Sequence, residues 1–132
     1  MKKTIAEQLH SRKLHKPNPV LYWIFMLVIR ILNLKTHTHF TYKAHPGKDK
    51  GPFVMISNHA SRVEYQFMCP PCLPRRLNFV VGYNEFFRFP LSIVVKIMQV
   101  IPKKNFTPDL YCAKQIMSII KQGGCVSLLP EG

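Results

Sequence analysis

Short apolar runs alternate with segments of helical character from residue 53 onward, and this alternation limits the fold more than any other feature of the sequence. The apolar runs comprise residues 53–56, 77–81, 100–101 and 125–129. The run at 53–56 is wholly apolar, which is typical of a strand buried on both faces, as in a parallel sheet covered by helices. The helical segments between them are 61–67, 86–98 and 107–122. The sequence therefore predicts an α/β fold, with strands and helices alternating around a mostly parallel sheet.

Capping and breaking residues predict where these helices begin and end. We expect Ser61 to cap the helix at 61–67 and the prolines at positions 70, 71 and 74 to stop it. Thr107-Pro108-Asp109 combines a capping hydroxyl, a first-turn proline and a carboxylate near the positive end of the helix dipole. The helix that begins there is expected to end at Gly123-Gly124.

The segment at residues 40–44 has a different period. Phe40, Tyr42 and Ala44 alternate with polar neighbours, which is typical of a half-exposed strand. Residues 45–52 then form a turn by composition, because glycine and proline interrupt them repeatedly. We therefore expect one further strand before the first buried run.

The N-terminal part of the chain is basic and then strongly apolar. Residues 20–29 are all apolar and include Trp23, the single tryptophan of the chain. A spanning helix needs about 20 apolar residues, so we expect a helix that lies in one leaflet. Tyr22 and Trp23 would lie near the headgroups, and Lys35 would extend toward water. The alternative is an ordinary amphipathic helix buried in the protein core.

The net charge of +13 predicts contact with a polyanion. An apolar fraction of 47% excludes a disordered basic tail, because such tails lack the apolar surface that offsets chain entropy. Nucleic acid, an anionic membrane and phosphorylated substrates all fit the charge. We expect no nucleic acid partner, because the basic residues are spread along the chain without a known binding motif.

The four cysteines indicate a reducing compartment, since no secretory signal peptide precedes them. Cys69 and Cys72 have the spacing of a zinc knuckle, but Cys112 and Cys125 lie far apart and complete no second pair. A zinc or redox site is therefore the weaker interpretation. We interpret the first pair as loop thiols beside two prolines and expect no metal.

Two groups of polar residues follow predicted strands and are candidates for chemistry. His59 lies just beyond the run at 53–56, and Glu64 lies about one helical turn further on, where its carboxylate can orient the imidazole as a base. The alternative is a surface histidine beside an unrelated glutamate. Lys103 and Lys104 end the run at 100–101 and are natural phosphate contacts, with a solvated loop as the alternative.

Taken together, these motifs resemble the glycerolipid acyltransferase family, which contains the 1-acyl-glycerol-3-phosphate acyltransferases. Asn58, His59 and Ser61 match the first family motif, NHxSxxD, and 129–132 (Leu-Pro-Glu-Gly) match the start of the third, FPEG. The two motifs also stand in the family order, about 70 residues apart. The resemblance covers approximately residues 20–132. It implies division into a basic segment with a membrane-associated helix at 1–39 and the N-terminal part of an acyltransferase domain at 40–132.

The resemblance implies an enzyme that transfers a fatty acyl group from acyl-CoA or acyl-carrier protein to a lysophospholipid hydroxyl, without a further cofactor. His59 would be the base and Glu64 its orienting carboxylate. The remaining implied residues would bind substrate, with Asn58 and Ser61 in the first motif; Arg62, Lys103 and Lys104 on the phosphate; and Glu131 and Gly132 on the acceptor. Anionic membrane lipids would be partners, and the protein would act at the cytoplasmic face of a membrane.

The sequence also departs from the family pattern. Glu64 stands where the family has Asp, and Asn105 stands where many members carry a phosphate-binding Arg. The third motif ends at Gly132, so we expect the chain to be the front portion of a longer protein, with its sheet incomplete at the C-terminus. The alternative function is a truncated, non-catalytic membrane-binding protein derived from such an enzyme.

Overall fold

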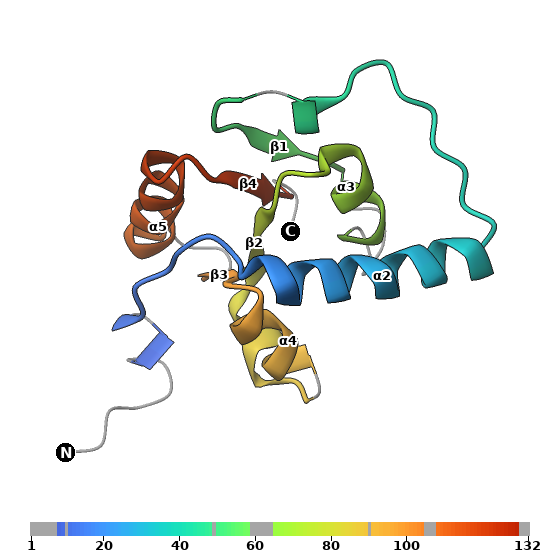
Figure 1. Cartoon of the computed structure of the whole chain (residues 1–132). Coiled ribbons are helices and arrows are strands. Elements are labelled where there is room, and N and C mark those ends of the chain that lie inside the picture. Colours follow the sequence, from blue (N-terminus) through green and yellow to red (C-terminus); the bar gives the residue numbers. More distant parts are fainter. Residues whose placement is uncertain are drawn as a thin grey trace.

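The computed structural model describes residues 8–9, 11–48, 50–58, 65–89, 91–104 and 108–129 of the chain (Figure 1). The helices are α2 (Pro19–Lys35), α3 (Tyr65–Cys72), α4 (Leu91–Ile97) and α5 (Leu110–Lys121), with 3₁₀ turns η1 (Pro46–Lys48) and η2 (Tyr83–Phe87). The strands are β1 (Val54–Ile56), β2 (Leu77–Gly82), β3 (Ile101–Lys103) and β4 (Cys125–Leu128). Strands and helices alternate from β1 onward, which confirms the predicted α/β class.

The four strands form one sheet in the order β1-β4-β2-β3, and all three pairings are parallel. The predicted parallel sheet is therefore confirmed. β2 and β4 occupy the centre, and their first three residues are buried. β1 differs from the prediction of a strand buried on both faces, because Ile56 is 66% exposed and Val54 is also exposed. The reason is its position, since β1 pairs with β4 alone in the described sheet.

Helices cover both faces of the sheet. On one face, α5 packs through Cys112 and Ile119 against Ile101 and Val126. On the other, one cluster joins residues of α2, α3 and α4 to the sheet; its members include Tyr22, Met26, Ile29, Met68, Leu77, Phe79, Val95 and Met98. Leu77 and Phe79 face this cluster, whereas the intervening Asn78 points away, as the period of two in a strand requires.

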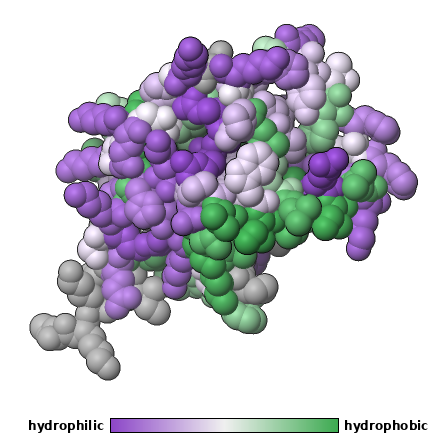
Figure 2. All heavy atoms as spheres, viewed as in Figure 1, coloured by the Kyte–Doolittle hydropathy of each residue, from purple (hydrophilic) through white to green (hydrophobic). Residues whose placement is uncertain are grey.

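Helix α2 is held against the sheet by one of its faces. Tyr22, Met26 and Ile29 are buried at helical spacing, and the Tyr22 hydroxyl accepts a hydrogen bond from the Leu77 N–H at 3.2 Å. The prediction that Tyr22 lies near lipid headgroups is therefore wrong, because that side chain is fully buried. The opposite face of α2 is apolar and exposed, and Figure 2 shows it as a green band along the molecule. No helix among the described residues is long and apolar enough to cross a membrane.

The prolines of α3 do not stop the helix, contrary to the sequence-based expectation. Pro70 and Pro71 lie inside it, and it ends at Cys72. A proline at position 70 leaves the carbonyl of Gln66 without its helical N–H partner. The Asn33 side-chain amide of α2 donates to that carbonyl at 3.2 Å. A contact from a distant part of the sequence therefore offsets the defect. Ser61, the expected cap, lies outside the described residues.

The ends of α5 agree with the prediction, with one change of cap. Asp109 caps the helix, because its Oδ1 accepts from the Cys112 N–H at 3.0 Å; Thr107 is outside the described residues. At the other end Gly123 has φ +77 and donates to the Ile120 carbonyl, while Gly124 donates to that of Ile119. These two bonds form a Schellman motif, for which glycine is the favoured residue.

The segment at 40–44 forms no strand, so that prediction is wrong. The rings of Phe40 and Tyr42 stack with centroids 5.9 Å apart, but the chain between α2 and η1 pairs with no strand of the described sheet. Alternating residues favour a strand only where a partner supplies the ladder hydrogen bonds. The segment is instead part of a long loop that connects the end of α2 to η1 (Figure 1).

Candidate functional site

The carboxyl ends of β1 and β4 lie side by side and carry the two motif segments. Ile56 pairs with Leu128, and the Ser57 N–H donates to the Leu128 carbonyl at 3.3 Å. Asn58 follows β1 and is exposed, while Leu129 follows β4 and is half-buried. Ligand sites of parallel α/β sheets lie at this edge. The segments that continue into the first and third motifs therefore leave the sheet next to each other.

Most predicted site residues lie beyond these anchoring positions. His59, Ser61, Arg62 and Glu64 are outside the described residues, and so are Glu131 and Gly132. Asn58 is the described residue of the first motif. The pairing of His59 with Glu64 accordingly stays a prediction, as do the contacts of Glu131 and Gly132.

Lys103 and Lys104 lie at the far side of the same sheet edge. Lys103 ends β3 opposite Gly82 of β2 and is half-buried, whereas Lys104 is exposed. β4 and β2 separate β3 from β1, and three strand spacings amount to about 14 Å. The structure therefore places both lysines on the predicted edge, but not next to the Asn58 segment.

The backbone at Lys104 is fixed by the cap of α5. Its N–H donates to Asp109 Oδ2 at 2.9 Å, while Oδ1 of the same carboxylate caps the helix. One carboxylate thus joins the end of β3 to the start of α5 and sets the direction in which the chain leaves the sheet. Burial raises the pKa of Cys112 to about 11. The nearby Asp109 adds to this rise, and the positive charge of Lys103 opposes it by a smaller amount.

Tyr83 is a polar residue on this edge that the sequence analysis missed. It follows β2, between the ends of β4 and β3, and its ring contacts Phe87 with centroids 5.4 Å apart. Burial raises the pKa of its phenol, so the group is neutral and keeps its proton near pH 7. The available signal was its position directly after the apolar run at 77–81, the same signal that singled out His59.

Helix α2 contacts the start of α3, which follows the first motif in the sequence. α3 begins at Tyr65, directly after residues 59–64, and the Tyr65 ring lies 5.9 Å from that of Phe25 in α2. One residue further, the Gln66 amide donates to the Asn33 side-chain oxygen at 2.9 Å. The apolar helix therefore fixes one end of the 59–64 segment.

The cysteines lie in the core rather than in loops, which corrects their sequence-based interpretation. Cys69 and Cys72 are buried on α3, and Cys72 Sγ lies 3.2 Å from Met55 Sδ. Burial raises the pKa of Cys69 to about 12 and that of Cys72 to about 11. Both thiols are therefore protonated at neutral pH, unlike the thiolates that bind zinc or attack substrates. Across the described positions, no group of three or more metal-ligating residues comes together.

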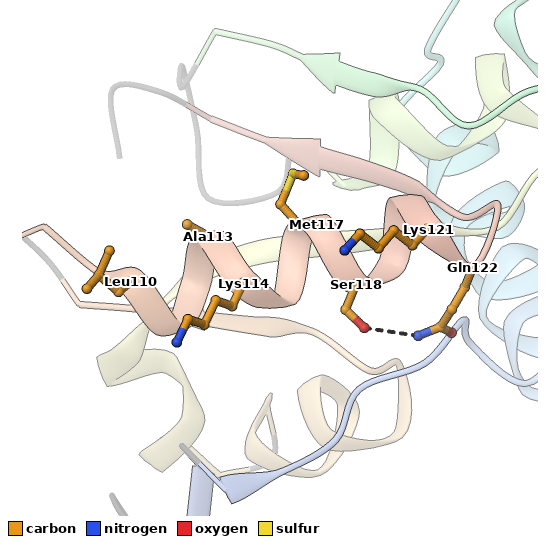
Figure 3. Close-up of a pocket in the computed structure, with 7 residues that line it drawn as sticks. All are labelled: Leu110, Ala113, Lys114, Met117, Ser118, Lys121 and Gln122. Atoms are coloured by element: carbon orange, nitrogen blue, oxygen red, sulfur yellow. Dashed lines mark hydrogen bonds between the residues drawn. The ribbon is translucent and has the colours of Figure 1, made fainter.

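A shallow hollow of about 590 Å³ lies elsewhere, along the outer face of α5. Figure 3 shows that its lining side chains come from α5 and from its C-cap residue Gln122, which is joined to Ser118 by a hydrogen bond. It includes none of the residues at the ends of β1 and β4. We therefore assign the candidate site to the sheet edge and not to this hollow.

Comparisons with protein-family models, with curated proteins and with solved structures found no match to this chain.

Proposed function

We propose that this protein is a membrane-associated acyltransferase that moves a fatty acyl group from an acyl thioester to the hydroxyl of a lysophospholipid in phospholipid biosynthesis. The observation that supports it is the parallel pairing of β1 with β4, with Ile56 opposite Leu128. Two motif segments about 70 residues apart in sequence thereby leave the sheet side by side. An acyl transfer that uses both motifs at one site requires this arrangement.

In the proposed reaction His59 removes the proton from the acceptor hydroxyl, and Glu64 orients the imidazole and stabilises its cation. The acceptor oxygen attacks the thioester carbon, the carbon–sulfur bond breaks, and the thiolate of CoA or of the carrier protein takes the proton from His59. No covalent acyl-enzyme forms, so the buried and protonated cysteines have no part in it. Asn58 and Ser61 of the first motif bind substrate, and Glu131 and Gly132 position the acceptor.

The proposed phosphate-binding residues serve two different substrates in this proposal, because they follow strands that are not neighbours in the sheet. Arg62 belongs to the segment after β1 and fits the phosphate of the lysophospholipid acceptor. Lys103 and Lys104 follow β3, about 14 Å away by strand spacing. They fit the phosphates of a long donor such as CoA better than a phosphate close to the reacting hydroxyl.

The proposal is tested by acyl transfer from a labelled acyl-CoA to 1-acyl-glycerol-3-phosphate, with the chain synthesised in the presence of lipid vesicles. We expect transfer by the natural chain and a loss of about 10²–10⁴-fold in His59→Ala, the usual contribution of a general base. His39→Ala is the control, because His39 is an exposed histidine outside the motifs. Unchanged transfer by His59→Ala would overturn the proposed role of His59.

A non-catalytic membrane-binding protein is the second candidate, because the exposed apolar face of α2 accounts for lipid binding without turnover. The same preparation separates the two candidates. Vesicle binding without transfer from either acyl-CoA or an acyl-carrier protein would favour the second.

A further inference from the structure

A second apolar surface accompanies that of α2 and lies on η2, α4 and the turn between them. Its exposed side chains are Phe87, Phe89, Ile93, Val94 and Ile97. Phe89 is 81% exposed, which is extreme for an aromatic residue. Scattered single apolar residues are normal on a protein surface, but an apolar group of this size indicates an interaction site.

Helix α4 is apolar on both of its sides. Val95 and Met98 point into the core, while Ile93, Val94 and Ile97 are exposed. A surface helix of a water-soluble protein has polar residues opposite its buried stripe. The inward side of α4 packs in the core of this chain. Its outward side is therefore free to contact a partner or a membrane.

The surfaces of α2 and α4 belong to one side of the molecule. Tyr22, Met26 and Ile29 of α2 share a core cluster with Val95 and Met98 at α4, so both helices cover the same face of the sheet. The chain before α2 also reaches α4, because Arg12 Nη2 donates to the Lys96 carbonyl at 3.1 Å. Figure 2 shows the apolar band of α2 continuing downward over the region where Figure 1 places α4. We name this combined surface the composite apolar face.

Exposed basic residues lie on the same helices as the composite apolar face. They are Arg30 and Lys35 of α2 and Lys96 of α4. Arg12 also reaches α4 through the Lys96 carbonyl. An apolar surface bordered by cations complements a leaflet of anionic lipid, whose tails meet the apolar side chains and whose headgroups meet the cations. Two copies of this chain would instead bring like charges together.

We propose that α2 and the η2–α4 segment dock together onto one leaflet of an anionic membrane, with Ile24, Leu27, Phe89, Ile93 and Ile97 among the side chains that enter it. The proposal rests on the membrane association in the proposed function and adds α4 as a second, independent contact. Contact through two separate helices prevents the protein from rotating about either one, so docking restricts the orientation of the protein on the membrane. It also brings Phe25, and with it the start of α3 after the first motif, close to the lipid.

The test is vesicle flotation of the full chain made by cell-free synthesis, with vesicles of phosphatidylcholine alone or mixed with phosphatidylglycerol. Ile93→Gln/Ile97→Gln removes two exposed side chains from α4. Leu110→Gln/Met117→Gln is the matched control, because these residues are as exposed but lie on α5, on the other face of the sheet. Glutamine keeps the helix propensity high, and circular dichroism checks that each variant is folded.

We expect the natural chain and the α5 control to float with the mixed vesicles, and less with phosphatidylcholine alone. The α4 variant should need about tenfold more lipid for half binding, since two half-exposed side chains lose their transfer to lipid. Trp23, the single tryptophan and an exposed residue of α2, should still shift its emission to the blue in that variant at high lipid. That shift would show that α2 still inserts when the α4 contact is weakened.

Equal lipid affinity of the α4 variant and the α5 control would overturn the second contact and leave the proposed acyltransferase intact. Failure of the natural chain to bind any vesicle would overturn the docking proposal, while acyl transfer measured in detergent micelles would still test the enzyme. Crosslinking of Ile93→Cys between copies, in place of vesicle binding, would assign the face to a second copy of the chain.

Discussion

The hydroxyl of Tyr22 anchors α2 to the sheet, and its removal in Tyr22→Phe is expected to destabilise the fold. It accepts the Leu77 N–H at 3.2 Å, and both residues are 0% exposed. Burial raises the pKa of this phenol, and the neighbouring Cys69 adds to that rise. Phenylalanine keeps the ring and its packing, so the substitution isolates the polar contact.

The expected loss of stability in Tyr22→Phe follows from the Leu77 N–H, which loses its acceptor. Without the hydroxyl, the buried Leu77 N–H has lost the acceptor that it had, and an unsatisfied buried donor costs about 1–3 kcal/mol. In a domain of this size about 2 kcal/mol corresponds to a fall of about 6–10 °C in melting temperature. We expect the effect in the stability of the whole fold, because Leu77 belongs to a central strand.

The assay is thermal unfolding followed by circular dichroism in mild detergent, with Tyr42→Phe as the control because Tyr42 is exposed. The pH dependence gives a second readout. Burial raises the pKa of Tyr22 well above its usual value, so the stabilisation is complete below the unfolded tyrosine pKa of about 10 and is lost as pH rises beyond it. The advantage of the natural chain over Tyr22→Phe should therefore shrink above about pH 10. Equal melting temperatures for Tyr22→Phe and Tyr42→Phe at pH 7 would refute the reasoning.

Two further predictions concern the core and the edge of the sheet. Cys69 and Cys72, whose thiol pKa values burial raises to about 12 and about 11, should react with a thiol-specific disulfide reagent at pH 8 far more slowly in the folded chain than in urea; equal rates would contradict their burial. Asp109→Ala should destabilise the chain by about 1 kcal/mol or more in urea unfolding, because it removes the cap of α5 and the acceptor for Lys104. Asp109→Asn should restore the part of the loss that comes from the cap, because its one side-chain oxygen can still accept from the Cys112 N–H but cannot also accept from Lys104; a loss as large as that of alanine would contradict the capping role.

The sequence was sufficient to predict elements whose signals are local. The start of α5 near Asp109, the Gly123 stop and the runs that form β2 and β4 each depend on a few adjacent residues, and all are present in the structure, although Asp109 rather than Thr107 is the observed cap. The mistaken predictions depended on neighbours distant in sequence. Pro70 is accommodated because Asn33 supplies a donor to Gln66, and Asn33 lies more than 30 positions earlier.

The candidate site likewise combines features that adjacent residues indicate with features that depend on distant parts of the chain. Each motif could be identified from adjacent residues, and each follows an apolar run at the edge where parallel sheets bind ligands. The strand order that puts β4 beside β1, and β3 at the far side, has no signature in any single segment. The sequence therefore predicted that the groups containing His59 and Lys103 each follow a strand, but not that two strands separate β1 from β3.

Helix α2 shows why composition alone could not decide between a core helix and a membrane helix. Its residues are apolar almost all round, so no polar stripe indicates which side faces the protein. The fold determines which side of the helix is buried. Tyr22, Met26 and Ile29 pack into the core, whereas the neighbouring Trp23 and Leu27 are exposed. A helix that needed only a protein core would gain nothing from the apolar residues on its exposed side. The expectation of a core helix therefore holds for one face of α2. Membrane association stays a prediction for the exposed face, which the lipid experiments test.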